Sequence, residues 1–390
     1  MNNNYILALD VGTTGIKAFV FDDALCVRGR AYESLPIIKK PGGIVEQDPF
    51  MILHKSEQVM RRVIQESNVS KEKIMAMGIT NQRETTIVWD KHTGKPVHNA
   101  IVWKDSRTQT LCVRLEKQYG TYVKKKTGLP ILPYFSASKI IWILQHNIST
   151  QKLSKKQLLC GTVDSWLLWH WLEHHDHVTD YTNASRTLLF NIKTRAWDKK
   201  LLSFFNIPYT MLPRTKPSQS LFGILKKELL GISIPIRGVC GDQEASLYAA
   251  GTKKSTTKVT YGTGAFLLIC IGNKFRTHPA FFTTLTAGKK NAPYAFEKKV
   301  VEDCGVKVAR VLGHYNELIK YLTQLTKKVS KNIQKIPFHP KEIVIDGGIT
   351  QIPYLSDLQS ELFQIPVRRQ VLFDGTALGI AKLVKDSMKK

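Results

Sequence analysis

The sequence is poor in acidic residues relative to basic ones. Its 390 residues include 57 lysines and arginines but 31 aspartates and glutamates, so the formal net charge at pH 7 is +26. Such an excess favours anionic partners, whether nucleic acid, acidic membrane or phosphorylated small molecules. The charge is spread along the chain and no nucleic-acid-binding motif accompanies it, so we expect a lysine-rich surface and no nucleic-acid-binding function.

The sequence also lacks paired cysteines and long apolar segments. Its six cysteines lie far apart, with no C-x-x-C pair and no histidine set to complete a zinc site, which is typical of reduced thiols in a cytoplasmic protein. No run of 18 apolar residues occurs, and the first residues carry neither the basic segment nor the apolar run of a signal peptide. We therefore expect a cytoplasmic protein with no membrane span.

The composition is that of an ordinary globular protein. Hydrophobic residues make up 43% of the chain and aromatic residues 9%, which excludes the disordered, collagenous and disulfide-dense classes. A length of 390 residues is too great for one hydrophobic core and fits two domains.

Two short Gly/Thr turns, each between two predicted strands, indicate two related halves. The first turn joins strands at 5–9 and 16–21, and the second joins strands at 257–261 and 265–271. Because the later part repeats the strand–turn–strand unit that opens the chain, we predict a domain boundary near residue 248. The predicted domains are residues 1–248 and residues 249–390.

Helical and strand patterns alternate around these turns. Residues 49–66 carry apolar side chains at helical spacing, and the apolar run at 74–79 follows as a strand. A strand-rich opening followed by helix–strand alternation indicates the α/β class. Further helices are predicted at 108–119, 136–146, 163–172, 199–205, 243–250, 307–329 and 376–385, with a return to strand and loop near 233–238 and a strand at 342–345.

The two turns are suited to binding phosphate, because glycine and threonine present backbone N–H groups and small hydroxyls without obstruction. Either turn alone is more typical of a plain hairpin. Asp10, directly before the first turn, is placed to hold a water molecule of a Mg²⁺ ion. No G-x-x-x-x-G-K-S/T motif is present, which excludes the Walker type of phosphate site.

Eight motifs resemble, in their order along the chain, those of the FGGY carbohydrate kinases. The match is nearly continuous to about residue 270 and patchy beyond it. The stretches at 81–86 (Asn-Gln-Arg-Glu-Thr-Thr) and 182–187 (Thr-Asn-Ala-Ser-Arg-Thr) resemble the branch of the family that acts on glycerol. The motifs are Asp10-Val11-Gly12-Thr13-Thr14, residues 78–86, 100–103, 161–166 and 180–187, Gly241-Asp242-Gln243, residues 261–264, and Asp346-Gly347-Gly348.

The resemblance implies a fold and an activity. The implied fold is α/β, with two actin-like, ribonuclease H-like domains around a central cleft. The first would bind polyol and phosphate, and the second, reduced because the chain is shorter than typical members, would bind nucleotide. The implied activity is ATP-dependent phosphorylation of glycerol to sn-glycerol 3-phosphate, with Mg²⁺. Two alternatives stay open: a catalytically impaired polyol-binding or regulatory protein of kinase descent, and a kinase for another polyol or a ketose. Assembly into a homo-oligomer also stays open.

The resemblance further implies roles for single residues. Asp242 would be the general base, and Trp166 and Arg186 are interpreted as structural supports. Lys17 stands where the family usually has arginine, so it keeps the charge but loses the bidentate fork. The implied glycerol contacts are Arg83, Glu84, Trp103, Tyr134, Asp242, Gln243 and Phe266. The implied ATP contacts are Thr13, Thr14, Gly15, Lys17, Thr263 and Gly348, and Asp10 would hold Mg²⁺ through water.

The resemblance is weakest where the adenine would lie. Residues 298–305 replace a small-residue helix start that helps members of the family to bind nucleotide. Ile352 stands where an asparagine usually follows the Gly-Gly turn. We therefore expect an intact polyol and phosphate side and an altered adenine side.

Overall fold

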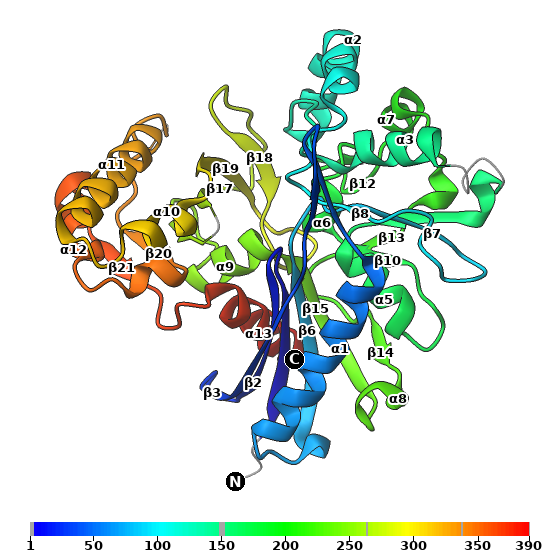
Figure 1. Ribbon diagram of the computed structural model, residues 1–390, viewed down its shortest axis with the longest axis horizontal. Coiled ribbons are helices and arrows are strands. Elements are labelled where there is room, and N and C mark those ends of the chain that lie inside the picture. Colours follow the sequence, from blue (N-terminus) through cyan, green and yellow to red (C-terminus); the bar gives the residue numbers. More distant parts are fainter. Residues whose placement is uncertain (1–3, 148–152, 263, 337, 390) are drawn as a thin grey trace.

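The computed structural model describes residues 4–147, 153–262, 264–336 and 338–389. Within these ranges the chain forms two lobes, each built on a six-stranded mixed sheet (Figure 1). The strands of the first sheet, in spatial order, are β14 (Gly223–Leu225), β15 (Ile234–Gly241), β6 (Ile74–Asn81), β1 (Tyr5–Val11), β2 (Gly15–Asp22) and β3 (Val27–Ser34). Those of the second are β18 (Phe282–Leu285), β19 (Tyr294–Val301), β17 (Ala265–Gly272), β16 (Thr257–Tyr261), β20 (Ile343–Asp346) and β21 (Val367–Arg369).

The two sheets share one topology. In each, three neighbouring antiparallel strands (β1-β2-β3 and β16-β17-β19) are followed in sequence by two parallel strands beside the first of them (β6 and β15, β20 and β21). Short turns join these antiparallel strands, except that β18 intervenes between β17 and β19. The parallel pairs need long crossovers, which supply the covering helices. The repeat confirms the predicted α/β fold of two ribonuclease H-like domains.

Helix α1 (Pro49–Glu66) has the predicted bounds and covers one face of the first sheet. The Asp48 carboxylate caps it by accepting hydrogen bonds from the backbone N–H groups of Phe50 and Met51. Pro49 takes the first helical position, where its missing N–H leaves no hydrogen bond unmade. Local sequence therefore determines where this helix begins.

Two helices cover the opposite face of the first sheet: α9 (Asp242–Ala250) and α13 (Gly375–Met388), which pack against each other. Although α13 is the last helix, it crosses β1, β6 and β15 of the first sheet. Gly78 permits this approach, since a Cβ there would lie 2.6 Å from Ile380 of α13. The end of the chain thus completes the core of the first lobe, while the boundary near residue 248 stays a prediction.

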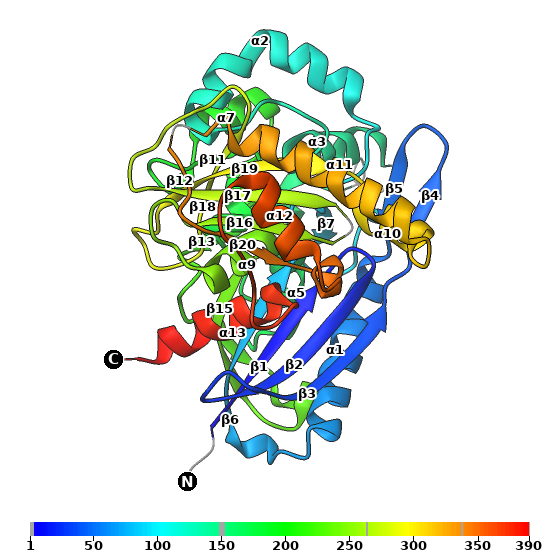
Figure 2. The ribbon, with the colours of Figure 1, turned by 90° about the vertical axis from the view of Figure 1, so that its left-hand side faces the viewer.

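Three helices pack against the second sheet: α10 (Cys304–Val311), α11 (Tyr315–Ile333) and α12 (Leu355–Phe363). Figure 2 shows α11 and α12 lying across it. The helix signals predicted over 307–329 are divided between α10 and α11 in the structure. The chain breaks between α10 and α11, where Gly313 has a φ of 102° that a right-handed helix does not allow.

The remaining elements form an insertion between β6 and β15 and short connections elsewhere. The helices are α2 (Gln109–Thr127), α3 (Ser136–His146), α5 (Val163–Trp171), α6 (Tyr181–Ser185), α7 (Lys199–Phe205) and α8 (Lys227–Leu230), with 3-10 turns η1 (Lys71–Lys73), η2 (Lys155–Gln157), η3 (Tyr209–Met211) and η4 (Gly348–Gln351). The strands are β4 (Ile38–Lys40), β5 (Ile44–Gln47), β7 (Ile87–Asp90), β8 (Ala100–Ile101), β9 (Leu158–Gly161), β10 (Val178–Asp180), β11 (Phe190–Asn191), β12 (Ala196–Trp197) and β13 (Arg214–Lys216). Among the described residues, no helix is both long and apolar enough to cross a membrane.

Candidate functional site

One cavity of about 260 Å³ collects the residues that the sequence analysis selected. Its lining comes from both lobes, from positions more than 300 residues apart in the chain. Thr263 lies outside the described residues. The other predicted site residues all line this cavity: Asp10, Thr13, Thr14, Gly15, Lys17, Arg83, Glu84, Trp103, Tyr134, Asp242, Gln243, Phe266 and Gly348.

Each Gly/Thr turn is closed by a backbone hydrogen bond between two glycines, three residues apart in the first turn and two apart in the second. The N–H of Gly12 donates to the carbonyl of Gly15, and the N–H of Gly262 donates to the carbonyl of Gly264, both at 3.0 Å. The glycines of both turns line the cavity. The matching turns therefore form two walls of backbone and small side chains, which suits phosphate oxygens.

The Gly-Gly turn after β20 joins this wall. Gly347 has a φ of 95°, and a Cβ there would lie 2.3 Å from the carbonyl oxygen of Tyr261, so only glycine fits. Gly348 follows at the start of η4 and lines the cavity. A Cβ at Gly348 would meet no atom of the described residues within 4 Å, so this edge is open to a ligand.

The start of α13 supplies cavity residues that the sequence analysis missed. Asp374 forms an ion pair with Lys17, and Thr376 donates a hydrogen bond to Oδ2 of Asp10 at 2.7 Å. Burial raises the pKa of Asp10, although Lys17 opposes this shift. No local pattern could have identified these partners, because they reach the first turn only through the packing of α13 on the first lobe.

The carboxylates of the cavity do not form a metal cage on their own. In the described ranges, no group of three or more histidine, cysteine, aspartate or glutamate side chains is arranged to hold a metal ion. A Mg²⁺ ion is commonly held by one or two carboxylates together with water and substrate phosphates. Asp10, Asp346 and Asp374 line the cavity and are available for that type of binding.

An aromatic wall faces these turns. The ring of Trp103 lies 5.5 Å from that of Tyr134 and 6.3 Å from that of Phe266, both edge to face. The indole N–H of Trp103 donates to Oγ1 of Thr13 at 2.8 Å. This bond ties the aromatic wall to the first Gly/Thr turn, which the motifs alone did not indicate.

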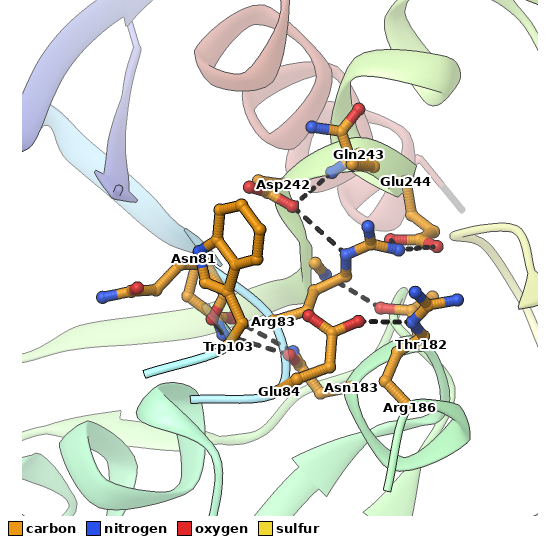
Figure 3. Close-up of polar contacts among 12 residues, drawn as sticks. Asn81, Arg83, Glu84, Trp103, Thr182, Asn183, Arg186, Asp242, Gln243 and Glu244 are labelled. Atoms are coloured by element: carbon orange, nitrogen blue, oxygen red, sulfur yellow. Dashed lines mark hydrogen bonds and ion pairs between the residues drawn. The ribbon is translucent and has the colours of Figure 1, made fainter. Parts of the chain in front are cut away.

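Asp242 lies at the start of α9, and 27% of its side chain is exposed. Its Oδ1 atom accepts the N–H of Gln243 at 2.7 Å and lies 3.3 Å from Nε of Arg83 (Figure 3). Burial raises the pKa of Asp242 to about 6, while Arg83 acts in the opposite direction. A carboxylate that titrates near neutral pH in a cleft suits proton transfer.

Arg83 and Glu84 belong to a buried network of ion pairs. Arg83 contacts Glu244 at 2.9 Å, and Glu84 accepts from Arg186 at 2.5 Å (Figure 3). Arg83 also contacts Glu297 at 2.7 Å. Glu84 has a φ of 60°, a left-handed conformation that aims its carboxylate at this network and the cavity. The sequence analysis missed Glu244 and Glu297. The available signal was that each is a charged residue within a helix or strand of mainly apolar residues.

Comparison with known proteins places the chain in a family. A family profile described as "FGGY family of carbohydrate kinases, N-terminal domain" matches residues 5–249. Glycerol kinase 2 of Thermotoga maritima and the glycerol kinase of Fusobacterium nucleatum are each 36% identical to this chain, over 97% of this chain and 89% of theirs.

Solved structures agree with this placement. The glycerol kinase of Plasmodium falciparum with ADP superimposes with a TM-score of 0.90 at 27% identity, over 100% of this chain and 90% of that chain. The ligand-bound xylulose kinase of Lactobacillus acidophilus shares the fold, with a TM-score of 0.86 at 17% identity over 99% and 89% of the two chains. Topology, cavity and matched sequence agree, and the chain belongs to the FGGY family of carbohydrate kinases.

Proposed function

We propose that this protein is a glycerol kinase, which transfers the γ-phosphoryl group of ATP to a terminal hydroxyl of glycerol and forms sn-glycerol 3-phosphate. The observation that carries the proposal is one cavity in which the Asp242 carboxylate, the Arg83–Glu84 pair and an aromatic wall face two phosphate-suited turns. The relatives named glycerol kinase, similar along almost the whole chain, support the choice of acceptor.

The chemistry of the cavity suits a small triol. Arg83 supplies N–H donors, while Glu84 and Asp242 supply carboxylate acceptors for hydroxyl groups. Trp103 and Phe266 cover the carbon atoms with apolar surface. An apolar alcohol would leave these buried hydrogen-bond donors and acceptors without partners, whereas the hydroxyls of a polyol pair with them. The cavity therefore favours a polyol over an apolar alcohol.

Asp242 is the proposed general base. Its carboxylate takes the proton of the terminal hydroxyl as that oxygen forms a bond to the γ-phosphorus, and the bond from this phosphorus to the β–γ bridging oxygen breaks to release ADP. Gln243, the next residue, lines the cavity beside it and is a proposed hydroxyl contact. Asp242 therefore touches the reacting hydroxyl and is the proposed catalytic residue.

The two turns are the proposed phosphate site. Thr13, Thr14 and Gly15 of the first turn offer hydroxyls and backbone N–H groups, and Lys17 offers a positive charge that Asp374 holds in place. Thr263 is proposed by resemblance alone. Gly348 is the proposed contact to adenosine, because its edge of the cavity is open.

Mg²⁺ fits the carboxylates of this cavity. Oδ2 of Asp374 and Oδ1 of Asp346 are buried and accept no hydrogen bond among the described residues, so they have lone pairs for a cation or its water shell. Each oxygen also faces a cationic side chain, Arg30 at 3.4 Å and Lys258 at 3.7 Å, with which Mg²⁺ would share it. Asp10 is the proposed ligand, through water. A bound Mg²⁺ would neutralise charge on the transferring phosphates.

The proposal is tested by coupled ADP release from purified protein with Mg²⁺-ATP, with and without glycerol, and with a panel of other polyols and ketoses. We expect ADP release that depends on glycerol. Faster turnover with a ketose or a longer polyol would identify that compound, and not glycerol, as the substrate. If no compound in the panel is phosphorylated but glycerol still raises the melting temperature, the proposed kinase activity is contradicted. That result would support a polyol-binding protein.

A further inference from the structure

Glu297 links the two lobes through a fully buried ion-pair cluster. It lies on β19 of the second sheet, and its two carboxylate oxygens accept bonds from Nη1 and Nη2 of Arg83 at 2.8 and 2.7 Å. Arg186, on the first-lobe side, approaches the same carboxylate at 3.1 Å. One carboxylate of the second sheet thus holds two guanidinium groups presented by the insertion of the first lobe.

The cluster contains no exposed member. Glu297 and Glu84 are each 1% exposed, Arg83 is 3% exposed, and Arg186 and Glu244 are fully buried. Burial opposes ionisation of Glu297, but Arg186 and Arg83 together hold the pKa of its carboxyl below the usual range. Removing one partner would leave a buried charge without compensation, so the cluster is expected to keep its arrangement.

The bidentate contact determines the direction in which Arg83 points. A guanidinium group is planar and rigid, so fixing both terminal nitrogens also fixes the Nε–H bond. Nε of Arg83 is buried and makes no hydrogen bond among the described residues, although it lies 3.3 Å from Asp242. Arg83 lines the cavity and its Nε is held beside the Asp242 carboxylate, so the bidentate contact with Glu297 positions Arg83 against the proposed general base.

We propose that Glu297 is a positioning residue that ties the polyol-binding Arg83 to the second lobe, so that the affinity for polyol depends on how the two lobes are arranged. The inference rests on the proposed function, because it assumes that Arg83 contacts the acceptor. Glu297 itself touches neither polyol nor nucleotide in this scheme. Arg186 supports it from the opposite side by holding Glu84 and Glu297 together.

The test is Glu297→Gln, with Asp22→Asn as the matched control. Asp22 is also a largely buried carboxylate paired with an arginine, Arg28, but it lies at the far end of β2 from the cavity turn. We expect Glu297→Gln to raise the KM for glycerol by about 100-fold and to change the KM for ATP by less than about threefold. Asp22→Asn should change neither constant.

A purely structural role gives a different result. It would lower the melting temperature of both variants and the amount of active enzyme, but leave the KM for glycerol unchanged, and this outcome overturns the inference. If Glu297→Gln does not fold, Arg186→Lys decides, because it keeps the charge and shortens the supporting arm. We then expect about a tenfold rise in the KM for glycerol, and an unchanged KM overturns the inference.

The dependence on lobe arrangement has its own readout. The ratio of the glycerol dissociation constants without and with ADP, measured by calorimetry, reports the coupling between the lobes. We expect this ratio to move toward one in Glu297→Gln, and an identical ratio in both proteins overturns the coupling. Wild-type protein without glycerol-dependent ADP release overturns the proposed function instead, so the two failures are distinguishable.

Discussion

The two sides of the cavity use different parts of the protein to make contacts. On the proposed polyol side, contacts come from side chains: the buried pair Arg83 and Glu84, the Asp242 carboxylate and the aromatic wall around Trp103. On the proposed phosphate side, the lining consists mainly of backbone, glycine and threonine, and its charges are Lys17 and the carboxylates proposed for Mg²⁺. The first side selects by functional groups, while the second binds a shape that any nucleoside triphosphate presents.

The difference predicts how each side fails. A side-chain site is disabled by removing a functional group at nearly constant fold, whereas a backbone site is disabled by adding atoms where glycine leaves room.

Asp242→Asn should have the largest effect on turnover. The amide cannot accept the hydroxyl proton, so we expect kcat to fall by about 1000-fold, while glycerol binding weakens but stays measurable. Steady-state kinetics and glycerol-induced thermal stabilisation measure the two quantities. Near-normal turnover in this variant would contradict the assignment of Asp242 as the base.

Neighbouring glycines on the phosphate side should respond in opposite ways. Gly347→Ala forces a side chain into a left-handed conformation against Tyr261, so we expect a loss of about 2–3 kcal/mol in the free energy of unfolding. Gly348→Ala has room in the fold, so we expect an unchanged melting temperature and a KM for ATP raised by about tenfold. Equal melting temperatures for the two variants would contradict a structural role that only Gly347 has. An unchanged KM for ATP in Gly348→Ala would contradict a contact between Gly348 and the nucleotide.

The pH dependence of kcat/KM tests the role of Asp242 on the polyol side. Burial raises the pKa of Asp242 to about 6, and only the ionised carboxylate accepts a proton. We therefore expect kcat/KM to fall by about tenfold for each pH unit below 6 and to level off above it. Rates from pH 5 to 8 measure this profile. A flat profile in the wild type, or the same slope in Asp242→Asn, would assign the titration to another group.

Trp103→Phe should have the smallest effect and tests the link between the two sides. The substitution keeps an apolar ring but removes the donor to Thr13, a loss of about 1 kcal/mol, so we expect kcat/KM for glycerol to fall by about fivefold. Trp197→Phe is the matched control, because its indole donates to the carbonyl of Pro213 and does not line the cavity. Equal losses of activity in the two variants would contradict a specific link.

Much of the fold could be predicted because it depends on neighbours in the sequence. The cap at Asp48 and the proline after it determine the start of α1, and the Gly/Thr turns determine the two hairpins. The division of the helix signals at 307–329 into two helices was not predicted, because a periodic apolar pattern does not show that Gly313 takes a positive φ.

The sequence by itself determined the two-part plan, the turns and most residues of the cavity, because spacing and residue type carry those features locally. The tertiary structure alone decided which side chains pair with these cavity residues: Asp374 with Lys17, Thr376 with Asp10, and Glu297 with Arg83. These pairs are separated by more than 200 residues. They form because α13 packs on the first sheet and β19 faces the insertion, and the carboxylates buried there need partners from the protein in place of water.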